Sequence, residues 1–587
     1  MTGTVYERIQ REPDAMGTDI GNRYSELMSN RATWEAEKRE LRNYIFATDT
    51  TKTTNSKSIW SNKTTVPKLC QIRDNLHANY MEALFPNEQF FKWEGATQED
   101  ATGPKRLAIE AYIRNKLKMS NFIDTVSKLV YDYIDYGNAF SDIDFVTEYV
   151  EDEETGEQIV GYIGPRLIRL SPMELIFNPT AATFKDSYKI TRVVKTLGEL
   201  KTDAAKFPDK QYNLDAVQQI ESGRKAFQGM STADQAKVEA YYIDGFGTLA
   251  TYYESDFTEL LEFEGTIHNP VTGKLEENRI ITVMDRQWVV RNVANPSWLG
   301  SSAKQHASWR KRPDNLYGMG PLDNLVGMQY RIDHLENLRA DVFDLIAYPP
   351  LKVRGNVEEF VWQPNEVIFL GDDGDVDMLR PDTTALNADF QIQNYEDKME
   401  LLAGAPREAM GIRSPGEKTA FEVERLDTAA SRIFQNKVAQ FEREVIEPTL
   451  LHFLEISRRN MNRPEVVRIM DDDLGVEAFI QVTKEDITAN GKLVPMGARH
   501  FAARNQLIQN LNGIVNSGMA PLVAPHMSGK ALASLLNEQF GFDKYGLFSD
   551  NVAVFEQMET QRLVQQGQEN LAVEQATPLE DENEAIA

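Results

Sequence analysis

The chain has 587 residues, with 63 Lys and Arg against 90 Asp and Glu, so its formal net charge is −27. A hydrophobic content of 41% excludes wholesale disorder. The acidic surplus argues against a tight, general nucleic-acid binder, although not against loose contact with DNA. A single cysteine, Cys70, excludes an internal disulfide and a multi-thiolate metal site and indicates a reducing compartment.

Helical patterns dominate the N-terminal region. A charged pattern covers residues 21–47, and a polar loop follows it. Pro67 then begins a helix that Pro86 ends, and its apolar face carries Leu69, Ile72, Leu76, Tyr80 and Leu84. Two further helices are predicted at 104–119 and 121–136, with Gly137 as the cap of the second.

A strand-rich region follows these helices. Residues 139–150 alternate between apolar and polar side chains, and a turn at 153–157 leads into strands at 159–163 and 166–170. Further strand-like pieces, separated by short helices, lie at 175–177, 190–194, 238–243 and 279–290. We therefore predict an α+β fold that is predominantly helical.

A long helix returns at 321–347 and ends at Pro349-Pro350. Its apolar side chains recur every three or four residues: Leu322, Leu325, Met328, Ile332, Leu335, Leu338, Val342 and Leu345. The segments predicted after it are strands at 351–354 and 359–370, an acidic turn at 371–377, a helix at 388–403 and a Gly/Pro-rich loop at 404–416.

The longest helical pattern runs from 419 to about 460, and Pro448 should bend it. Beyond Pro495 the chain is predicted to be mostly helical, ending in an acidic tail at 574–587. The stretch 505–529 carries no Asp, Glu, Lys or Arg, but its Asn and Gln side chains and two prolines argue against a membrane span. Residues 1–12 contain no apolar core of signal-peptide length.

Motifs for catalysis and for nucleotide binding are missing. A phosphate-binding loop needs Lys directly after its second glycine, whereas Glu417 stands between Gly416 and Lys418. Cys70, next to Leu69 and Ile72 on a predicted helix, is interpreted as a core thiol. We expect no catalytic residues, no cofactor and no enzymatic activity.

Metal-binding motifs are missing as well. The acidic residues 372–377 do not fit a calcium loop, because Met378 and Thr384 occupy the positions that need Gly and Glu. The seven histidines are scattered, with no metal-ligand spacing. We therefore expect no metal site.

The order of the elements between 321 and 460 resembles the portal proteins of tailed bacteriophages, which form rings at one capsid vertex. Local sequence is similar as well, at Tyr136-Gly-Asn-Ala-Phe140, Leu170-Ser-Pro-Met-Glu-Leu-Ile-Phe-Asn-Pro-Thr-Ala181, Tyr317-Gly-Met-Gly-Pro321 and Gly416-Glu-Lys-Thr-Ala-Phe-Glu422. The resemblance covers roughly 67–540, and the size and tail resemble a podovirus member.

The resemblance implies a portal-type architecture with wing, stem, clip and crown, assembling as a ring. The implied parts are an N-terminal helical arm (1–66), the wing (67–320), a stem helix (321–348), the clip (349–386), a second stem helix (387–403), the tunnel loop (404–418), a long wing helix with return strands (419–495) and a helical crown with an acidic tail (496–587).

The resemblance also implies a function. The ring of 12 subunits would be a channel for genome packaging and ejection, built in the host cytoplasm and located in the virion at the capsid vertex. Its partners would be the terminase large subunit, tail adaptor proteins, the major capsid and scaffolding proteins, and double-stranded DNA, with no membrane. The alternatives are another oligomeric head–tail scaffold or adaptor, and a P-loop packaging ATPase.

Two groups of site residues follow from this resemblance. Candidates for contact with DNA in the channel are Arg407, Arg413 and Lys418 near the tunnel loop, and Arg331 and Arg339 on the stem helix, which form salt bridges in the alternative interpretation. Candidates for the clip interface are Lys352, Phe360 and Trp362. Trp362 packs the small β core in its alternative interpretation.

Overall fold

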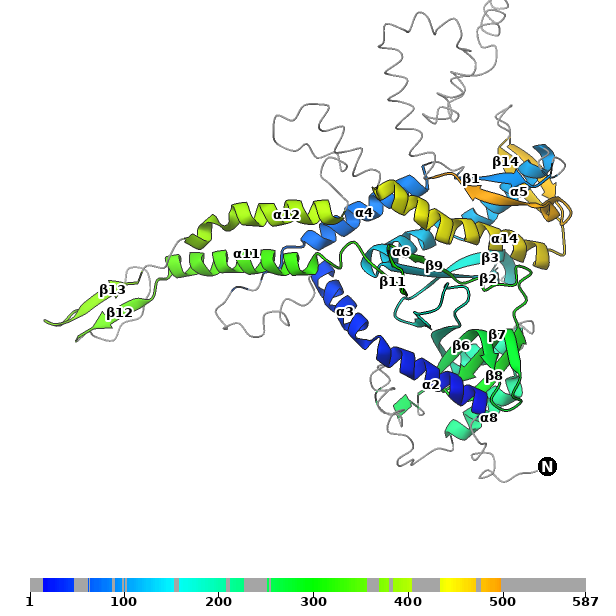
Figure 1. Cartoon of the computed structure of the whole chain (residues 1–587), viewed down its shortest axis with the longest axis horizontal. Helices are drawn as coiled ribbons and strands as arrows, with labels where there is room; N and C mark the ends of the chain where they lie inside the picture. The colour runs from blue at the N-terminus through cyan, green and yellow to red at the C-terminus, as the bar shows by residue number, and fades with distance from the viewer. Residues whose placement is uncertain are drawn as a thin grey trace, which may run out of the picture. The chain divides into compact units, whose positions relative to one another are not determined.

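The structure is a computed structural model that describes residues 14–46, 62, 64–86, 90–97, 100, 103–151, 158–206, 212–225, 247, 251–252, 255–355, 369–379, 384–403, 433–470 and 477–497. Of these residues 47% are helical and 29% lie in strands, so the prediction of a mixed α+β fold is confirmed (Figure 1). The chain divides into two units, and the described elements belong to the first, which comprises 1–85 and 89–498. The predicted crown at 496–587 lies outside the described residues except for its first two.

The charged N-terminal pattern forms two helices, α2 (Ala15–Asn30) and α3 (Ala32–Phe46), and not the single helix that we predicted. The break falls at Arg31, whose side chain is buried and ion-paired with Glu35 at 2.7 Å. Its guanidinium donates to the carbonyl oxygens of Pro172 at 3.1 Å and Leu175 at 2.7 Å. These distant contacts fix the break, so the local helical pattern could not reveal it.

The next three predicted helices are confirmed as α4 (Lys68–Leu84), α5 (Gly103–Met119) and α6 (Phe122–Asp135). The predicted apolar face of α4 is buried, and Gly137 follows α6 with φ +68°. Cys70 is not a core thiol as predicted. It lies beside the apolar face of α4, partly exposed, with its Sγ 3.7 Å from the Asp74 carboxylate.

A three-stranded antiparallel sheet follows α6, in the order β3-β2-β9. Its strands are β2 (Asn138–Glu151), β3 (Gln158–Leu170) and β9 (Gln305–Ser308). The two strands predicted at 159–163 and 166–170 are one continuous strand, β3, because both halves pair with β2.

A five-stranded antiparallel sheet holds its strands in chain order, from β4 to β8. They are β4 (Leu175–Phe177), β5 (Lys189–Thr196), β6 (Phe257–His268), β7 (Leu275–Met284) and β8 (Trp288–Ala294). Strand β6 was not predicted, and the piece predicted at 279–290 is the turn between β7 and β8 with parts of both strands. The piece predicted at 238–243 lies outside the described residues.

The turn between β7 and β8 contains no glycine, and so the sequence did not reveal it. Asp285 and Arg286 both have positive φ, 52° and 58°. Asp285 accepts a hydrogen bond from the Tyr252 hydroxyl at 2.6 Å, and Arg286 pairs with buried Glu259 at 2.7 Å. These contacts stabilise a backbone conformation that non-glycine residues rarely adopt.

Helices cover both faces of the five-stranded sheet. Met16, Ile20 and Tyr24 of α2 pack on one face. On the other face, α7 (Leu197–Lys206) and α8 (Leu214–Lys225) bury Leu200 and Val217. Since α2 forms one of the layers, the N-terminal helices are part of this core.

The C-terminal part of this unit is a helix followed by strands. Helix 433–441 continues through a π turn, Glu442–Ile446, into α14 (Glu447–Asn460). Pro448 has no N–H to bond to Glu444 and its ring crowds that carbonyl, which accounts for the π turn directly before it. Three strands follow in the part for which return strands were predicted: β14 (Glu465–Met470), β15 (Glu477–Val482) and β16 (Gly491–Pro495). Strand β16 pairs with β1 (Phe91–Gly95).

Candidate functional site: a helix–hairpin–helix segment

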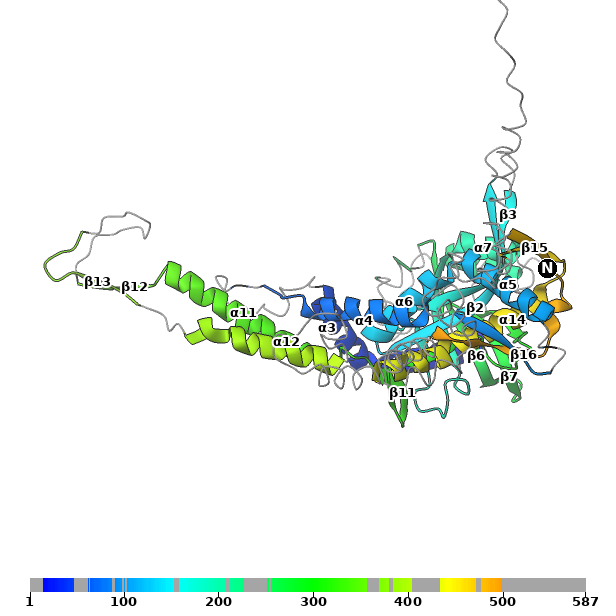
Figure 2. The same ribbon diagram turned by 90° about the horizontal axis from the view of Figure 1, so that it is seen from above.

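The segment that the resemblance assigns to stem and clip is a pair of helices joined by a β-hairpin. It comprises α11 (Val326–Ala347), β12 (Leu351–Arg354), β13 (Asp375–Met378), the 3₁₀ turn η2 (Thr384–Ala388) and α12 (Asp389–Ala403). Both views show α11 and α12 side by side (Figures 1 and 2). The helix predicted from residue 321 begins at Val326, because residues 320–325 form turns in which Gly320 N–H bonds to Asp323 and Leu325 N–H to Leu322.

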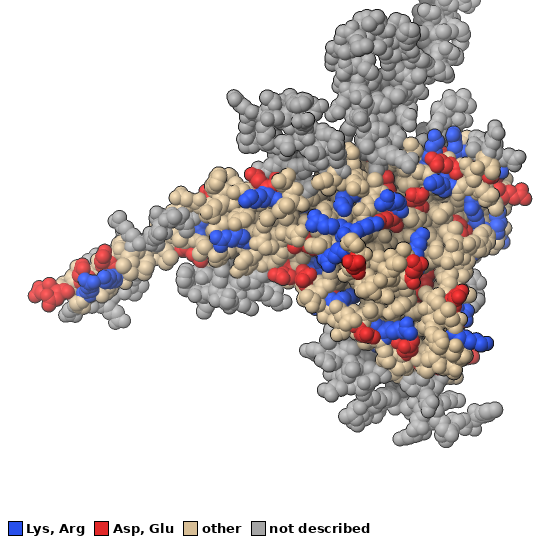
Figure 3. All heavy atoms as spheres, in the orientation of Figure 1, with Lys and Arg blue, Asp and Glu red and all other residues tan. Residues whose placement is uncertain are grey.

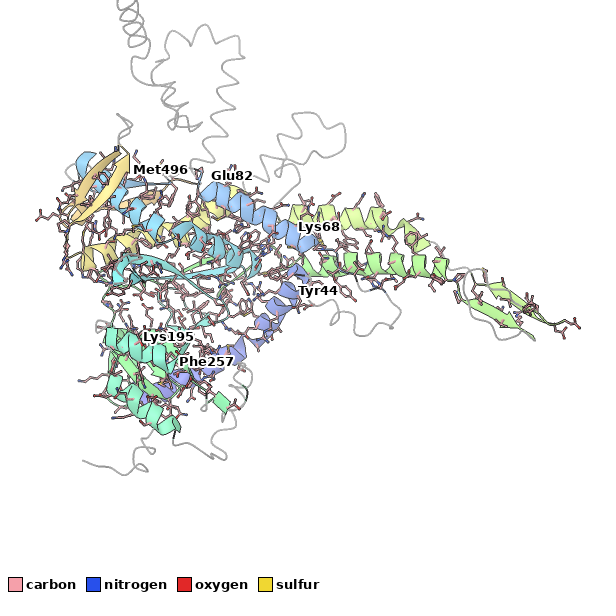
Figure 4. The ribbon with its side chains drawn as sticks, turned by 180° about the vertical axis from the view of Figure 1, so that it is seen from behind. Tyr44, Lys68, Glu82, Lys195, Phe257 and Met496 are labelled. Atoms are coloured by element: carbon pink, nitrogen blue, oxygen red, sulfur yellow. The ribbon has the colours of Figure 1, made fainter. Side chains whose placement is uncertain are left out.

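Ion pairs fix α11 and α12 antiparallel. Arg339, in the middle of α11, pairs with Asp389 at the start of α12 and with Glu336 at 2.5 Å. Near the end of α12, Glu400 forms a buried ion pair with Lys68 of α4 at 2.6 Å. Lys68 lies at the end of α4 that is next to α12 (Figure 4). Removing either partner of a buried pair leaves an uncompensated charge, so this contact strongly favours the observed arrangement.

A row of polar side chains on α11 binds the chain that leads into α4. Asn337 Oδ1 accepts from Thr64 N–H at 2.7 Å, and Asn337 Nδ2 donates to Thr64 O at 2.9 Å. One turn away, Asp333 accepts from Val66 N–H at 2.9 Å. The side chains of Asn337 and Asp333 are buried.

The same row extends at both ends. Gln329, fully buried, donates to Val66 O at 2.5 Å and accepts from Leu69 N–H at 3.3 Å. Toward the C-terminus, Asn62 bonds to Asp341 at 2.6 Å and to Asp344 at 2.7 Å. We call Gln329, Asp333, Asn337, Asp341 and Asp344 the polar row. Its spacing of four and three residues places it on one face of α11.

A second set of charges lies where α3, α4 and α6 meet the start of α11. Lys38 of α3 pairs with Asp323, and burial lowers its pKa. Asp135 of α6 pairs with Arg73 of α4 at 2.7 Å, and burial raises the pKa of Asp135.

Asp132 belongs to the same set. It pairs with Arg169 of β3 through both carboxylate oxygens, at 2.5 and 2.7 Å. Burial raises its pKa to about 6 even though Arg169 acts in the opposite direction. The charges of this set therefore connect three helices, a strand and the start of α11.

Apolar side chains are exposed along the helix pair and the hairpin. Phe390 is 77% exposed and Leu401 69% exposed on α12. The others are Tyr330, Leu338, Phe343, Ile346, Tyr348, Val353, Phe369, Leu370, Met378, Leu379 and Leu402. Exposed apolar side chains in this number are typical of surfaces that contact another chain.

The hairpin itself pairs basic residues with acidic ones. Lys352 is exposed and lies opposite Asp377, and Arg354 lies opposite Asp375. The predicted acidic turn at 371–377 is shorter than expected, because Asp375–Met378 forms β13 and only 371–374 makes the turn. Exposed Asp side chains gather at the tip of this hairpin (Figure 3).

The structure places only some of the residues that the sequence singled out. Arg339 is engaged in ion pairs, and Arg331 is exposed on α11. Their contact with DNA stays a prediction. Five candidates lie outside the described residues, as does the tunnel loop at 404–418: Arg407, Arg413, Lys418, Phe360 and Trp362.

Within the described ranges, no group of three or more His, Cys, Asp or Glu side chains could hold a metal ion. His77 stacks on Tyr131 at 3.7 Å and contacts Ser127, as expected of a helix residue with satisfied partners. No helix in the part of the chain that the structure describes is long and apolar enough to cross a membrane.

The polar row was not recognised from the sequence. Polar residues at 329, 333, 337 and 341 share a helical face, which was a usable signal, but their partners at 62–69 are remote in the chain. No family model and no curated protein matches this chain.

Proposed function

We propose that this chain is the portal protein of a tailed bacteriophage, a ring subunit at the capsid vertex. One observation carries the proposal: two antiparallel helices joined by a β-hairpin, with apolar side chains exposed along both helices. This is the arrangement that the resemblance implies for stem and clip, and it lies at the predicted place in the chain.

Exposed apolar side chains on α11 and α12 support assembly. Phe390 and Leu401 face away from the described core, and leaving them in water would cost roughly 1.5–3 kcal/mol each. Identical subunits related by a rotation axis bury such surfaces against each other without leaving an open edge. In a ring, each helix pair packs against the helix pairs of its neighbours.

The proposed ring conducts double-stranded DNA. A net charge of −27 on each subunit disfavours a tight grip on the polymer. Arg407, Arg413 and Lys418, with Arg331 of the stem, supply basic side chains for local contact with phosphates. The hairpin and the rest of the clip dock the terminase large subunit and later the tail adaptors, and the chain itself hydrolyses nothing.

Native mass spectrometry and electron microscopy of the purified full-length protein test this proposal. A ring of 12 copies has a mass of 12 × 66.7 kDa, about 800 kDa, with a central hole in projection. A protein that stays monomeric or dimeric at high concentration contradicts the proposal, and so does ATP hydrolysis by the pure chain.

A further inference from the structure

A small hairpin carries the chain's only run of three consecutive basic residues. Strand β10 (Arg310–Arg312) pairs with β11 (Asn315–Met319) through the turn Pro313-Asp314. Arg310, Lys311 and Arg312 are all exposed. Elsewhere on the face shown in Figure 3, basic side chains are scattered among acidic ones. We call these three residues with Lys437 the basic hairpin site.

The base of this hairpin is fixed. Trp309 is buried and donates through Nε1 to the Tyr80 hydroxyl at 2.9 Å. Lys437, on helix 433–441, donates to Trp309 O, and its ammonium lies 4.9 Å from the centre of the Trp309 ring. Gln440 donates to Ser308 O at 2.5 Å. The exposed cations therefore extend from a rigid frame, and Figure 2 shows the hairpin clear of the neighbouring sheets.

Cations outnumber acids at this site among the residues that the structure describes. Lys311 pairs with Glu444, Asp314 lies in the turn, and the Arg310 guanidinium lies 5.3 Å from the centre of the Trp309 ring. Burial is the main cause that lowers the pKa of Lys437, and the nearby charges of Arg310 and Lys311 lower it further. A bound anion would relieve this repulsion between cations.

We propose that the basic hairpin site binds the phosphate backbone of nucleic acid without reading its sequence. Arg310 and Arg312 are two residues apart on the exposed strand β10, with an irregularity of the strand pairing between them. Arginine side chains bind phosphate oxygens whatever the neighbouring base is. A protein partner is disfavoured because residues 310–314 offer no aromatic or long aliphatic anchor, which the cores of protein interfaces require. The choice of double-stranded DNA as the physiological ligand rests on the proposed function.

Fluorescence anisotropy with a labelled duplex of about 30 base pairs tests the site across a range of NaCl concentrations. In the double variant R310Q/R312Q, the slope of log K against log [NaCl] should fall by about 1.8, because each phosphate contact contributes about 0.9. The control R39Q/K128Q removes the same charge from exposed helix positions outside the site and should leave the slope unchanged. The variant R310K/R312K keeps the charges and should retain the wild-type slope.

Three results would overturn the inference: no salt-dependent binding by the wild type, the same slope in R310Q/R312Q and wild type, or equal losses in R310Q/R312Q and the control. Loss of assembly in R310Q/R312Q with unchanged DNA binding would assign the hairpin to a contact between subunits instead. The mass of each variant separates this inference from the proposed function. Rings with an unchanged slope contradict only the hairpin site, whereas a monomer whose slope depends on Arg310 and Arg312 contradicts only the portal assignment.

Discussion

The side chain of Asn337 hydrogen-bonds both backbone groups of Thr64: it accepts from the N–H at 2.7 Å and donates to the C=O at 2.9 Å. One side chain thus pairs with the N–H and the C=O of the same residue, as the backbone of a neighbouring β-strand would. Asn337 is 2% exposed, so it makes both bonds from a buried position on α11, whereas Thr64 is exposed.

The first prediction concerns this contact. Asn337→Ala removes both hydrogen bonds to Thr64, so the free energy of unfolding should fall by about 1–3 kcal/mol. Amide hydrogen exchange should also accelerate at residues 64–69. The exposed Asn394 of α12 provides a control, and N394A should change the free energy of unfolding by less than about 0.5 kcal/mol in urea denaturation. Equal effects of the two substitutions would rule out a special role for Asn337.

A second prediction concerns the buried pair of Lys68 and Glu400. Lys68→Met or Glu400→Met alone removes the ion partner of a buried charge and should cost about 3 kcal/mol of unfolding free energy. The double variant K68M/E400M should cost much less than the sum of the two single changes. Urea unfolding of the four proteins measures this coupling, and additive effects would contradict it.

Acid pH provides a third prediction. Burial raises the pKa of Asp132 to about 6 from an ordinary value of 3.8, so between these pH values the folded chain binds a proton that the unfolded chain releases. The contribution of Asp132 to stability therefore falls as pH rises from about 4 to 6 and is constant above that range. The difference in unfolding free energy, wild type minus D132N, should increase as the pH is lowered from 7 to 4. A pH-independent difference would show that this carboxyl does not titrate there.

A fourth prediction tests the break between α2 and α3. Arg31→Met removes the hydrogen bonds to the carbonyls of Pro172 and Leu175, so hydrogen exchange should accelerate in residues 15–46 and 171–177. Arg39→Met removes a guanidinium that is 69% exposed from the same helix pair and should leave exchange unchanged. Similar exchange in R31M and R39M would mean that the break does not depend on Arg31.

A fifth prediction links the exposed side chains to assembly. F390S/L401S removes two apolar side chains that the described core does not cover, so the ring should dissociate to smaller species in native mass spectrometry. The urea midpoint of the dissociated chain should stay near that of wild-type subunits. The control Q391S changes an exposed polar residue of the same helix and should leave the ring intact. Intact rings in F390S/L401S would place the subunit contact elsewhere.

The sequence predicted elements whose signal is local. The apolar periodicity of Leu69, Ile72 and Leu76 in α4 and the stop at Pro349-Pro350 after α11 each depend on neighbouring residues, and both predictions are confirmed. The order helix, β segment, helix was predicted in the same way. Strand β13 was not predicted, because it lies where an acidic turn was expected, and the strand predicted at 359–370 lies outside the described residues except for its last two.

Features fixed by remote contacts were missed. Arg31 ends α2 because of carbonyls more than 140 positions away, and the glycine-free turn at Asp285 depends on the Tyr252 hydroxyl. The same reason explains why the polar row and its partners could not be matched from the sequence alone.

The polar row is not repetitive, and this sets the axial position of α11. A slip by one helical turn, about 5.4 Å, would bring Asp333 or Asp341 to the place of Asn337. A carboxylate there could accept from Thr64 N–H but would face Thr64 O with negative charge and no donor. Apolar contacts alone would tolerate such sliding. The order Gln, Asp, Asn, Asp along one face therefore allows only one register between α11 and the chain before α4.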